Sequence, residues 1–143
     1  MSTLSARLPL GNSRRLGVLA GDLLAVIGIV SVGLYQHHGA AGFASPLSAA
    51  ETITPFVVGW LLCAGLAGLY GTEVLTDLGT AARLSVVTTF AAVNIALVLR
   101  ASPLFEGSAT WPFNLVMTVT VLAVVVPWRL VVARLLGGSM TAD

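Results

Sequence analysis

The sequence contains no lysine, a single cysteine and few charged residues of either sign. Charged residues make up 9% of its 143 residues and hydrophobic residues 57%, whereas roughly a quarter of a soluble domain is charged. This composition argues against a water-soluble fold. The net charge of +1 gives no basic surface for nucleic acid. Cys63 on its own can form neither an intrachain disulfide nor a cysteine metal cluster.

Long apolar runs occupy most of the chain. A membrane-spanning helix needs about 20 apolar residues, and the runs are too long and too uniformly apolar for the alternating strands of a membrane barrel. The expected spans are about 16–36, 53–71, 80–100 and 111–136, with Pro55 and Pro112 in first turns. We therefore predict an all-α transmembrane up-down four-helix bundle. It forms one domain, 16–136, between an N-terminal segment, 1–15, and a tail, 137–143.

The arginines predict how this bundle is oriented. With the N-terminus inside the cell, one arginine, Arg100, falls outside, and the other five that flank the spans fall inside: Arg7, Arg14, Arg15, Arg83 and Arg134. The positive-inside rule then places both termini in the cytoplasm and the protein in the cytoplasmic membrane. The pair Arg14-Arg15 resembles a twin-arginine export signal, but the apolar run after it is longer than a cleaved signal core.

Asp22 is the only charged residue within the first span, and Arg129 lies in the last. A carboxylate at such a depth costs about 2.5–3.5 kcal/mol on insertion scales, so it should face protein or water rather than lipid. Asp22 is six residues from Leu16, about 9 Å along a helix, and Arg129 lies about as far from the same end of the antiparallel last span. The two side chains can therefore meet.

Three interpretations of Asp22 follow. We favour an ion pair with Arg129 that fixes helix packing. Alternatively, Asp22 binds a cation or a proton and is held by Arg129 at rest. In the third, Arg129 reaches the cytoplasmic headgroups, and Asp22 pairs with Arg14 or Arg83.

Secondary candidates for a polar site lie elsewhere. On the outer face these are His37, His38 and Trp60, with Glu51 and Glu106 as further possible ligands in the loops. Their spacing matches no known metal or haem site, so no metal and no cofactor are predicted.

Within the spans, Asn94 is expected to hydrogen-bond to a neighbouring helix, with contact to a substrate as the less favoured alternative. The span threonines can bond back to their own helix. Pro127 interrupts the last span just before Arg129.

Several motifs together resemble a known family. They are Asp22 in the first span, Gly-Leu-Tyr-Gln-His-His at 33–38, Thr-Pro-Phe-x-x-Gly-Trp at 54–60 and Pro-Trp-Arg at 127–129. The chain is similar, from about 16 to 135, to small four-helix membrane proteins of haloarchaea and actinobacteria classed as a domain of unknown function. The family pattern has a basic residue before the histidine, where this chain has Tyr35-Gln36. The resemblance implies the fold and a membrane location, and adds no mechanism.

Three function classes remain open. The first, which we favour, is a structural or accessory subunit that packs against a larger membrane protein. The second is an oligomeric transporter of a small solute, ion or proton that uses Asp22, since one four-helix bundle barely encloses a pathway. The third is an enzyme or redox carrier that uses the histidines, which the absence of a visible nucleophile–base or ligand set disfavours.

Overall fold

The computed structural model describes residues 10–105 and 107–139, and within them it contains helices and turns but no strand. The elements in order are α1 (Asn12–His38), a 3₁₀ turn η1 (Gly39–Phe43), α2 (Pro46–Leu66), α3 (Thr72–Thr76), α4 (Leu78–Arg100) and α5 (Phe113–Ser139). In these residues, four helices are long and apolar enough to cross a membrane: α1 with η1, α2, α4 and α5. The all-α four-helix prediction is confirmed.

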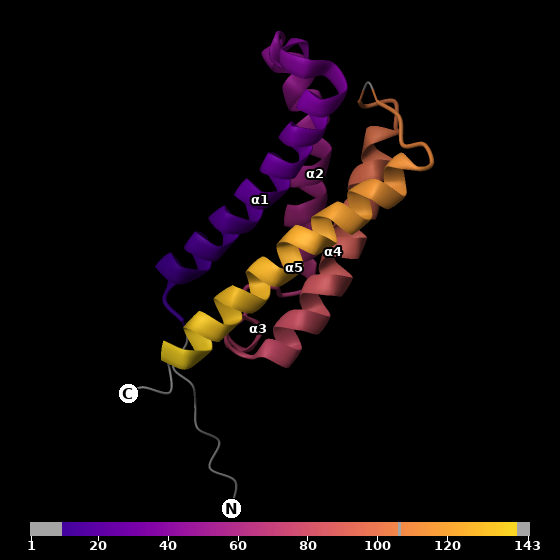
Figure 1. The fold of residues 1–143 in the computed structure, drawn as a ribbon. Helices are drawn as coiled ribbons and strands as arrows, with labels where there is room; N and C mark the ends of the chain where they lie inside the picture. The colour runs from indigo at the N-terminus through magenta and orange to yellow at the C-terminus, as the bar shows by residue number, and fades with distance from the viewer. Residues whose placement is uncertain (1–9, 106, 140–143) are drawn as a thin grey trace, which may run out of the picture.

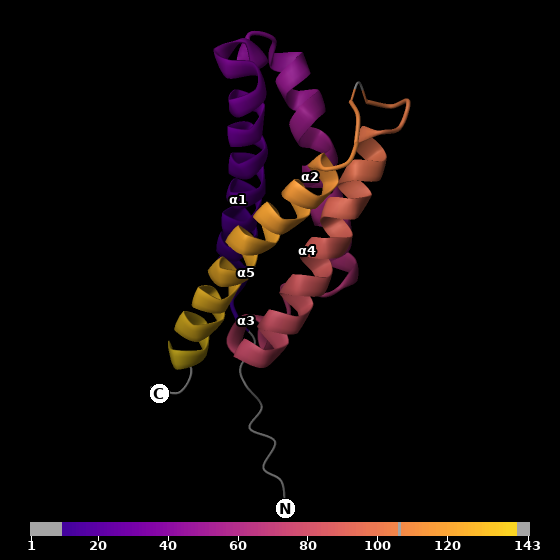
Figure 2. The ribbon, with the colours of Figure 1, turned by 45° about the vertical axis from the view of Figure 1, so that its right-hand side comes forward.

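The four long helices alternate in direction (Figures 1 and 2). The start of α1, the end of α5 and the short α3 lie at one end, here called the closed end. The α1–α2 turn and the α4–α5 loop lie at the other, here called the open end. The most extensive packing is between α2 and α4 and between α4 and α5, and α1 contacts both α2 and α5.

Close packing of α2 on α4 depends on a small residue. A Cβ atom on Gly59 would lie 2.5 Å from the carbonyl oxygen of Ala92 and 3.1 Å from the backbone nitrogen of Ala96. Small residues of this kind let helix backbones approach closely in membranes.

The start of α2 differs from the position expected from hydropathy. The helix begins at Pro46, not near Ile53, because Ser45 caps it: its Oγ accepts a hydrogen bond from the Ser48 N–H at 3.4 Å. Pro46 then occupies the first turn, where a missing N–H costs little. Pro55 was expected in the first turn and instead lies inside α2, buried.

The end of α2 also differs, and this difference shapes the site. The helix ends at Leu66, and Gly68 has a φ of +64°, the left-handed conformation that favours glycine. The Leu69 N–H bonds to the Ala64 carbonyl at 3.0 Å and the Gly68 N–H to the Gly65 carbonyl at 3.2 Å, which is the Schellman helix ending. The segment 67–71, expected to be helical, is therefore a turn in which Leu69 is fully buried.

Candidate functional site

The ion pair predicted between Asp22 and Arg129 is present in the core. The Arg129 Nη1 lies 3.3 Å from the Asp22 Oδ2, and the two side chains are 1% and 0% exposed. α1 supplies the carboxylate and α5 the guanidinium, which meet because the helices are antiparallel. The alternative partners Arg14 and Arg83 are exposed, so pairing of Asp22 with either is wrong.

Asp22 has two further hydrogen-bond donors. The Tyr70 hydroxyl donates to Asp22 Oδ2 at 2.7 Å, and the Trp128 indole N–H donates to Asp22 Oδ1 at 3.0 Å. Burial raises the pKa of the Tyr70 phenol above its ordinary value of 10, so the hydroxyl keeps its proton and can donate it. Both carboxylate oxygens are therefore occupied by protein donors.

The far side of Arg129 is also occupied. Its Nη2 donates to the Leu69 carbonyl oxygen at 2.6 Å, and its Cζ lies 5.3 Å from the centre of the Tyr70 ring. A guanidinium at that distance over an aromatic ring makes a favourable cation–π contact. The charge of Arg129 is thus shared between a carboxylate, a carbonyl and a ring.

Trp60 belongs to this cluster and not to the outer face where the sequence placed it. Its side chain is 1% exposed, and its indole N–H donates to the Tyr70 hydroxyl oxygen at 3.0 Å. Trp60 lies on the second half of α2, which leads to the closed end. The buried network, as we call it below after the buried ion pair at its centre, consists of Asp22, Trp60, Leu69, Tyr70, Trp128 and Arg129; Tyr70 is half-buried and Trp128 is 37% exposed.

The sequence reasoning missed three members of the buried network: Leu69, Tyr70 and Trp128. Tyr70 was placed near the end of a straight span, whereas the Gly68 turn brings it and the Leu69 carbonyl to the ion pair. Gly68 followed by an apolar residue, a Schellman signal, could have indicated this turn. Trp128 reaches Asp22 over Gly21, where a Cβ atom would overlap the indole ring.

The polar groups of the spans behave only in part as expected. Asn94 is exposed on α4 and donates to the Phe90 carbonyl of its own helix at 2.7 Å, not to a neighbouring helix. Thr118 bonds back to its own helix, as threonines commonly do. Thr88 and Thr89 are buried on α4, and their hydroxyls have no hydrogen-bond partner among the described residues.

His37 and His38 end α1 at the open end and are exposed, so they take no part in the buried network. They line a cavity of about 360 Å³ together with Arg100, the last residue of α4. Glu106, considered with them, lies outside the described residues. Within those residues, no group of three His, Cys, Asp or Glu side chains is arranged to hold a metal ion.

The geometry defines a helical protein with four helices long and apolar enough to cross a membrane and a buried Asp–Arg ion pair with further hydrogen bonds to other residues. The chain belongs to the DUF3054 family, described as a protein of unknown function, whose sequence profile matches residues 19–132. The matched region includes every member of the buried network. Neither the curated proteins nor the solved structures contain a match to this chain.

Proposed function

We propose that the protein is a non-enzymatic, multi-pass membrane protein that serves as a structural or accessory subunit for a larger membrane protein. In this proposal the buried network is a lock that joins α1, α2, α5 and the 67–71 turn. Its members come from all four of these segments, so its hydrogen bonds cross-link most of the bundle.

The number of protein donors that contact Asp22 carries this proposal. Three protein donors occupy the carboxylate, and the side chain is 0% exposed. A carboxylate that binds and releases a cation or proton needs free oxygen lone pairs and a route to water. A buried ion pair whose carboxylate accepts from three protein donors instead fixes the packing of its helices.

The location in this proposal is a prokaryotic cytoplasmic membrane with both termini in the cytoplasm. Arg14, Arg15 and Arg134 lie near the closed end, at the start of α1 and near the end of α5. The positive-inside rule assigns that end to the cytoplasm. Single cysteines placed at Ser139 and Ser45 in a Cys63→Ser background should report it: an impermeant maleimide labels Ser45→Cys in intact cells, and Ser139→Cys only after lysis.

The structural role of Asp22 is tested by Asp22→Asn in proteoliposomes. We expect wild-type vesicles to show the proton and potassium flux of empty vesicles, measured with an internal pH dye and a potassium electrode. The variant should lose stability in detergent. A wild-type flux that a folded Asp22→Asn protein lacks would support the transporter instead.

The accessory role is tested by mild-detergent extraction of the native membrane and native mass spectrometry. We expect the 14.7 kDa chain to leave the membrane in a fixed ratio with a larger membrane protein. A homo-oligomer or a lone chain as the sole species contradicts the accessory role.

A further inference from the structure

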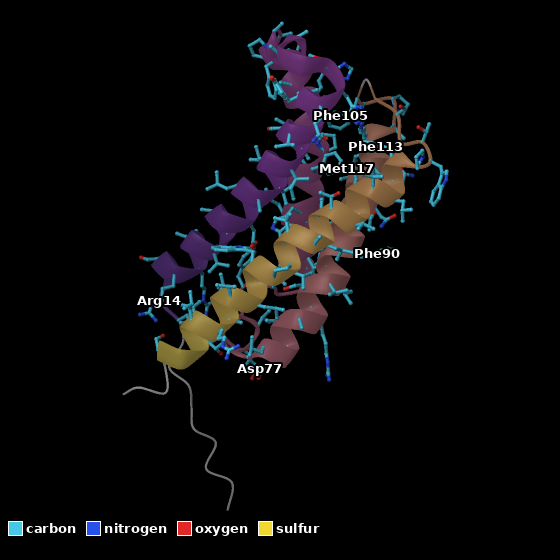
Figure 3. All side chains as sticks on the ribbon, in the orientation of Figure 1. Arg14, Asp77, Phe90, Phe105, Phe113 and Met117 are labelled. Carbon is cyan, nitrogen blue, oxygen red and sulfur yellow. The ribbon has the colours of Figure 1, made fainter. Side chains whose placement is uncertain are left out.

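The cavity at the open end is built by all four long helices and by the loop before α5. Its lining divides into polar and apolar residues. The polar ones are His37, His38, Thr52, Arg100, Ser108 and Thr110, and the apolar ones include Val30, Leu34, Phe56, Phe113 and Met117. Figure 3 shows Phe113 and Met117 near this end, away from Arg14 and Asp77 at the other.

The guanidinium of Arg100 is held at the cavity through its Nε atom. Its Nε–H donates to the Ser108 carbonyl at 3.3 Å, and its Cζ lies 5.7 Å from the centre of the Phe113 ring. Gly107 permits this position, since a Cβ atom there would lie 2.7 Å from the Arg100 Cγ. The two terminal nitrogens make no hydrogen bond to a described residue, so four N–H donors remain for a ligand.

The described lining contains a cation and two imidazoles but no carboxylate. Glu51, next to the lining residue Thr52, is not part of the wall. Arg129 donates to a carboxylate and to a carbonyl, whereas among the described residues Arg100 donates to one carbonyl and to no anion. Guanidinium groups bind carboxylate and phosphate oxygens through paired, charge-assisted hydrogen bonds.

The floor of the cavity is apolar and buried. Val30, Phe56 and Met117 are 4%, 3% and 7% exposed, whereas the histidines above them are exposed. The cavity volume of about 360 Å³ falls in the range of small-molecule sites, roughly 300–1,000 Å³. This lining matches a ligand with a negative head for Arg100 and an apolar body for the floor.

We propose that this cavity binds an amphipathic oxyanion, with a carboxylate or phosphate head paired to Arg100 and an apolar chain lying on Phe56, Phe113 and Met117. The same chemistry is offered by an anionic phospholipid of the surrounding leaflet and by a free organic acid. The site uses no member of the buried network, so it stands independently of the accessory role.

Octyl phosphate titrated into the protein in phosphatidylcholine nanodiscs tests the site by calorimetry. We expect saturable binding that Arg100→Gln weakens at least tenfold, the loss of a charge-assisted pair. Arg134→Gln, a matched loss of an exposed arginine at the closed end, should bind as the wild type does. Inorganic phosphate has only the anionic head of this ligand, and octanol has only its apolar chain. Both should bind at least tenfold more weakly than octyl phosphate.

A steric variant keeps the test valid if Arg100→Gln fails to fold. Gly33 lines the cavity and has open space where a Cβ would lie, so Gly33→Leu fills the cavity without a backbone clash. Gly28, on the same helix, is equally open but lies outside the lining, so Gly28→Leu is the matched control. We expect Gly33→Leu to abolish octyl phosphate binding and Gly28→Leu to leave it unchanged.

The two ligand sources separate when phosphatidylglycerol is added to the nanodiscs. If the natural ligand is a lipid, this anionic lipid should block the binding of octyl phosphate. If it is a free anion, the octyl phosphate titration should be unchanged. The proposal is overturned if wild type shows no saturable binding, or if Arg100→Gln and Arg134→Gln bind alike and Gly33→Leu binds like Gly28→Leu.

Discussion

Two arginines, Arg129 in the interior of α5 and Arg100 at the last residue of α4, have opposite surroundings. Arg129 is 1% exposed and its partners are a carboxylate, a carbonyl and an aromatic ring. Arg100 is half-buried beside a cavity, and one of its three nitrogens donates to a residue that the structure describes. A charged side chain inside a membrane by itself suggests a functional site. The number of its hydrogen-bonding groups that already have partners within the protein decides whether it fixes helix packing or can bind a ligand.

The largest effect should come from removing each arginine in turn. Arg129→Gln leaves Asp22 as an unpaired charge in the core and should lower the free energy of unfolding by about 3–5 kcal/mol. Arg100→Gln loses one long hydrogen bond at a half-buried position and should cost about 1 kcal/mol or less. Unfolding by SDS titration in mixed micelles, followed by circular dichroism, measures both, and equal costs would remove the distinction between the two arginines.

Next in size is loss of the Tyr70 hydroxyl. Tyr70→Phe removes a donor to the Asp22 carboxylate and an acceptor for Trp60, and should cost about 1.5–3 kcal/mol, as for hydrogen bonds to charged groups. Tyr35 is the other tyrosine of the chain and is exposed at the open end, so Tyr35→Phe is the matched control. The same titration should show no change for the control; a neutral Tyr70→Phe would show that the network does not depend on its hydroxyl.

A smaller effect is expected where Trp128 crosses α1. A methyl group on Gly21 overlaps the indole ring, so Gly21→Ala should displace Trp128 from Asp22 and cost on the order of 1–2 kcal/mol. Gly17, one turn away, has open space at its Cβ position, and Gly17→Ala should be neutral or stabilising. Trp128 fluorescence in a Trp60→Phe, Trp111→Phe background reports the displacement. An unchanged spectrum with unchanged stability contradicts the packing described for Gly21.

The smallest effect tests the turn that delivers Tyr70. Gly68→Ala places a side chain at a φ of +64° and should cost about 1 kcal/mol. Gly65→Ala, inside α2 with open space at its Cβ position, should be neutral or stabilising. The difference between these two alanine variants in SDS titration isolates the left-handed conformation, and identical stabilities would show that the turn carries no strain with alanine.

Hydropathy was sufficient to predict the number and the alternating direction of the long helices, because the backbone of a long apolar run can be hydrogen-bonded in a membrane in few ways. It was not sufficient for the limits of α2. An apolar average carries no information on the Ser45 cap, which starts the helix at Pro46, or on Gly68, which ends it. Both limits depend on single residues with specific backbone roles.

The ion pair could be predicted because depth along a helix follows from residue counting, and two antiparallel spans carry opposite charges at equal depth. The hydrogen-bond partners could not. Tyr70 reaches Asp22 through a turn outside the spans, and Trp60 was assigned to the outer face although α2 carries it to the closed end. Asn94 was expected to bridge helices, but its amide bonds to its own helix on the exposed face of α4.

The central claim, that Asp22 and Arg129 form a structural lock, is tested most directly by a double-mutant cycle of Asp22→Asn and Arg129→Gln in SDS-titrated unfolding. Each single variant leaves one buried charge unpaired, and the double variant leaves none. We predict that the double variant is more stable than either single variant, with a coupling free energy of about 2–3 kcal/mol. Single-variant costs that simply add in the double variant would contradict the lock.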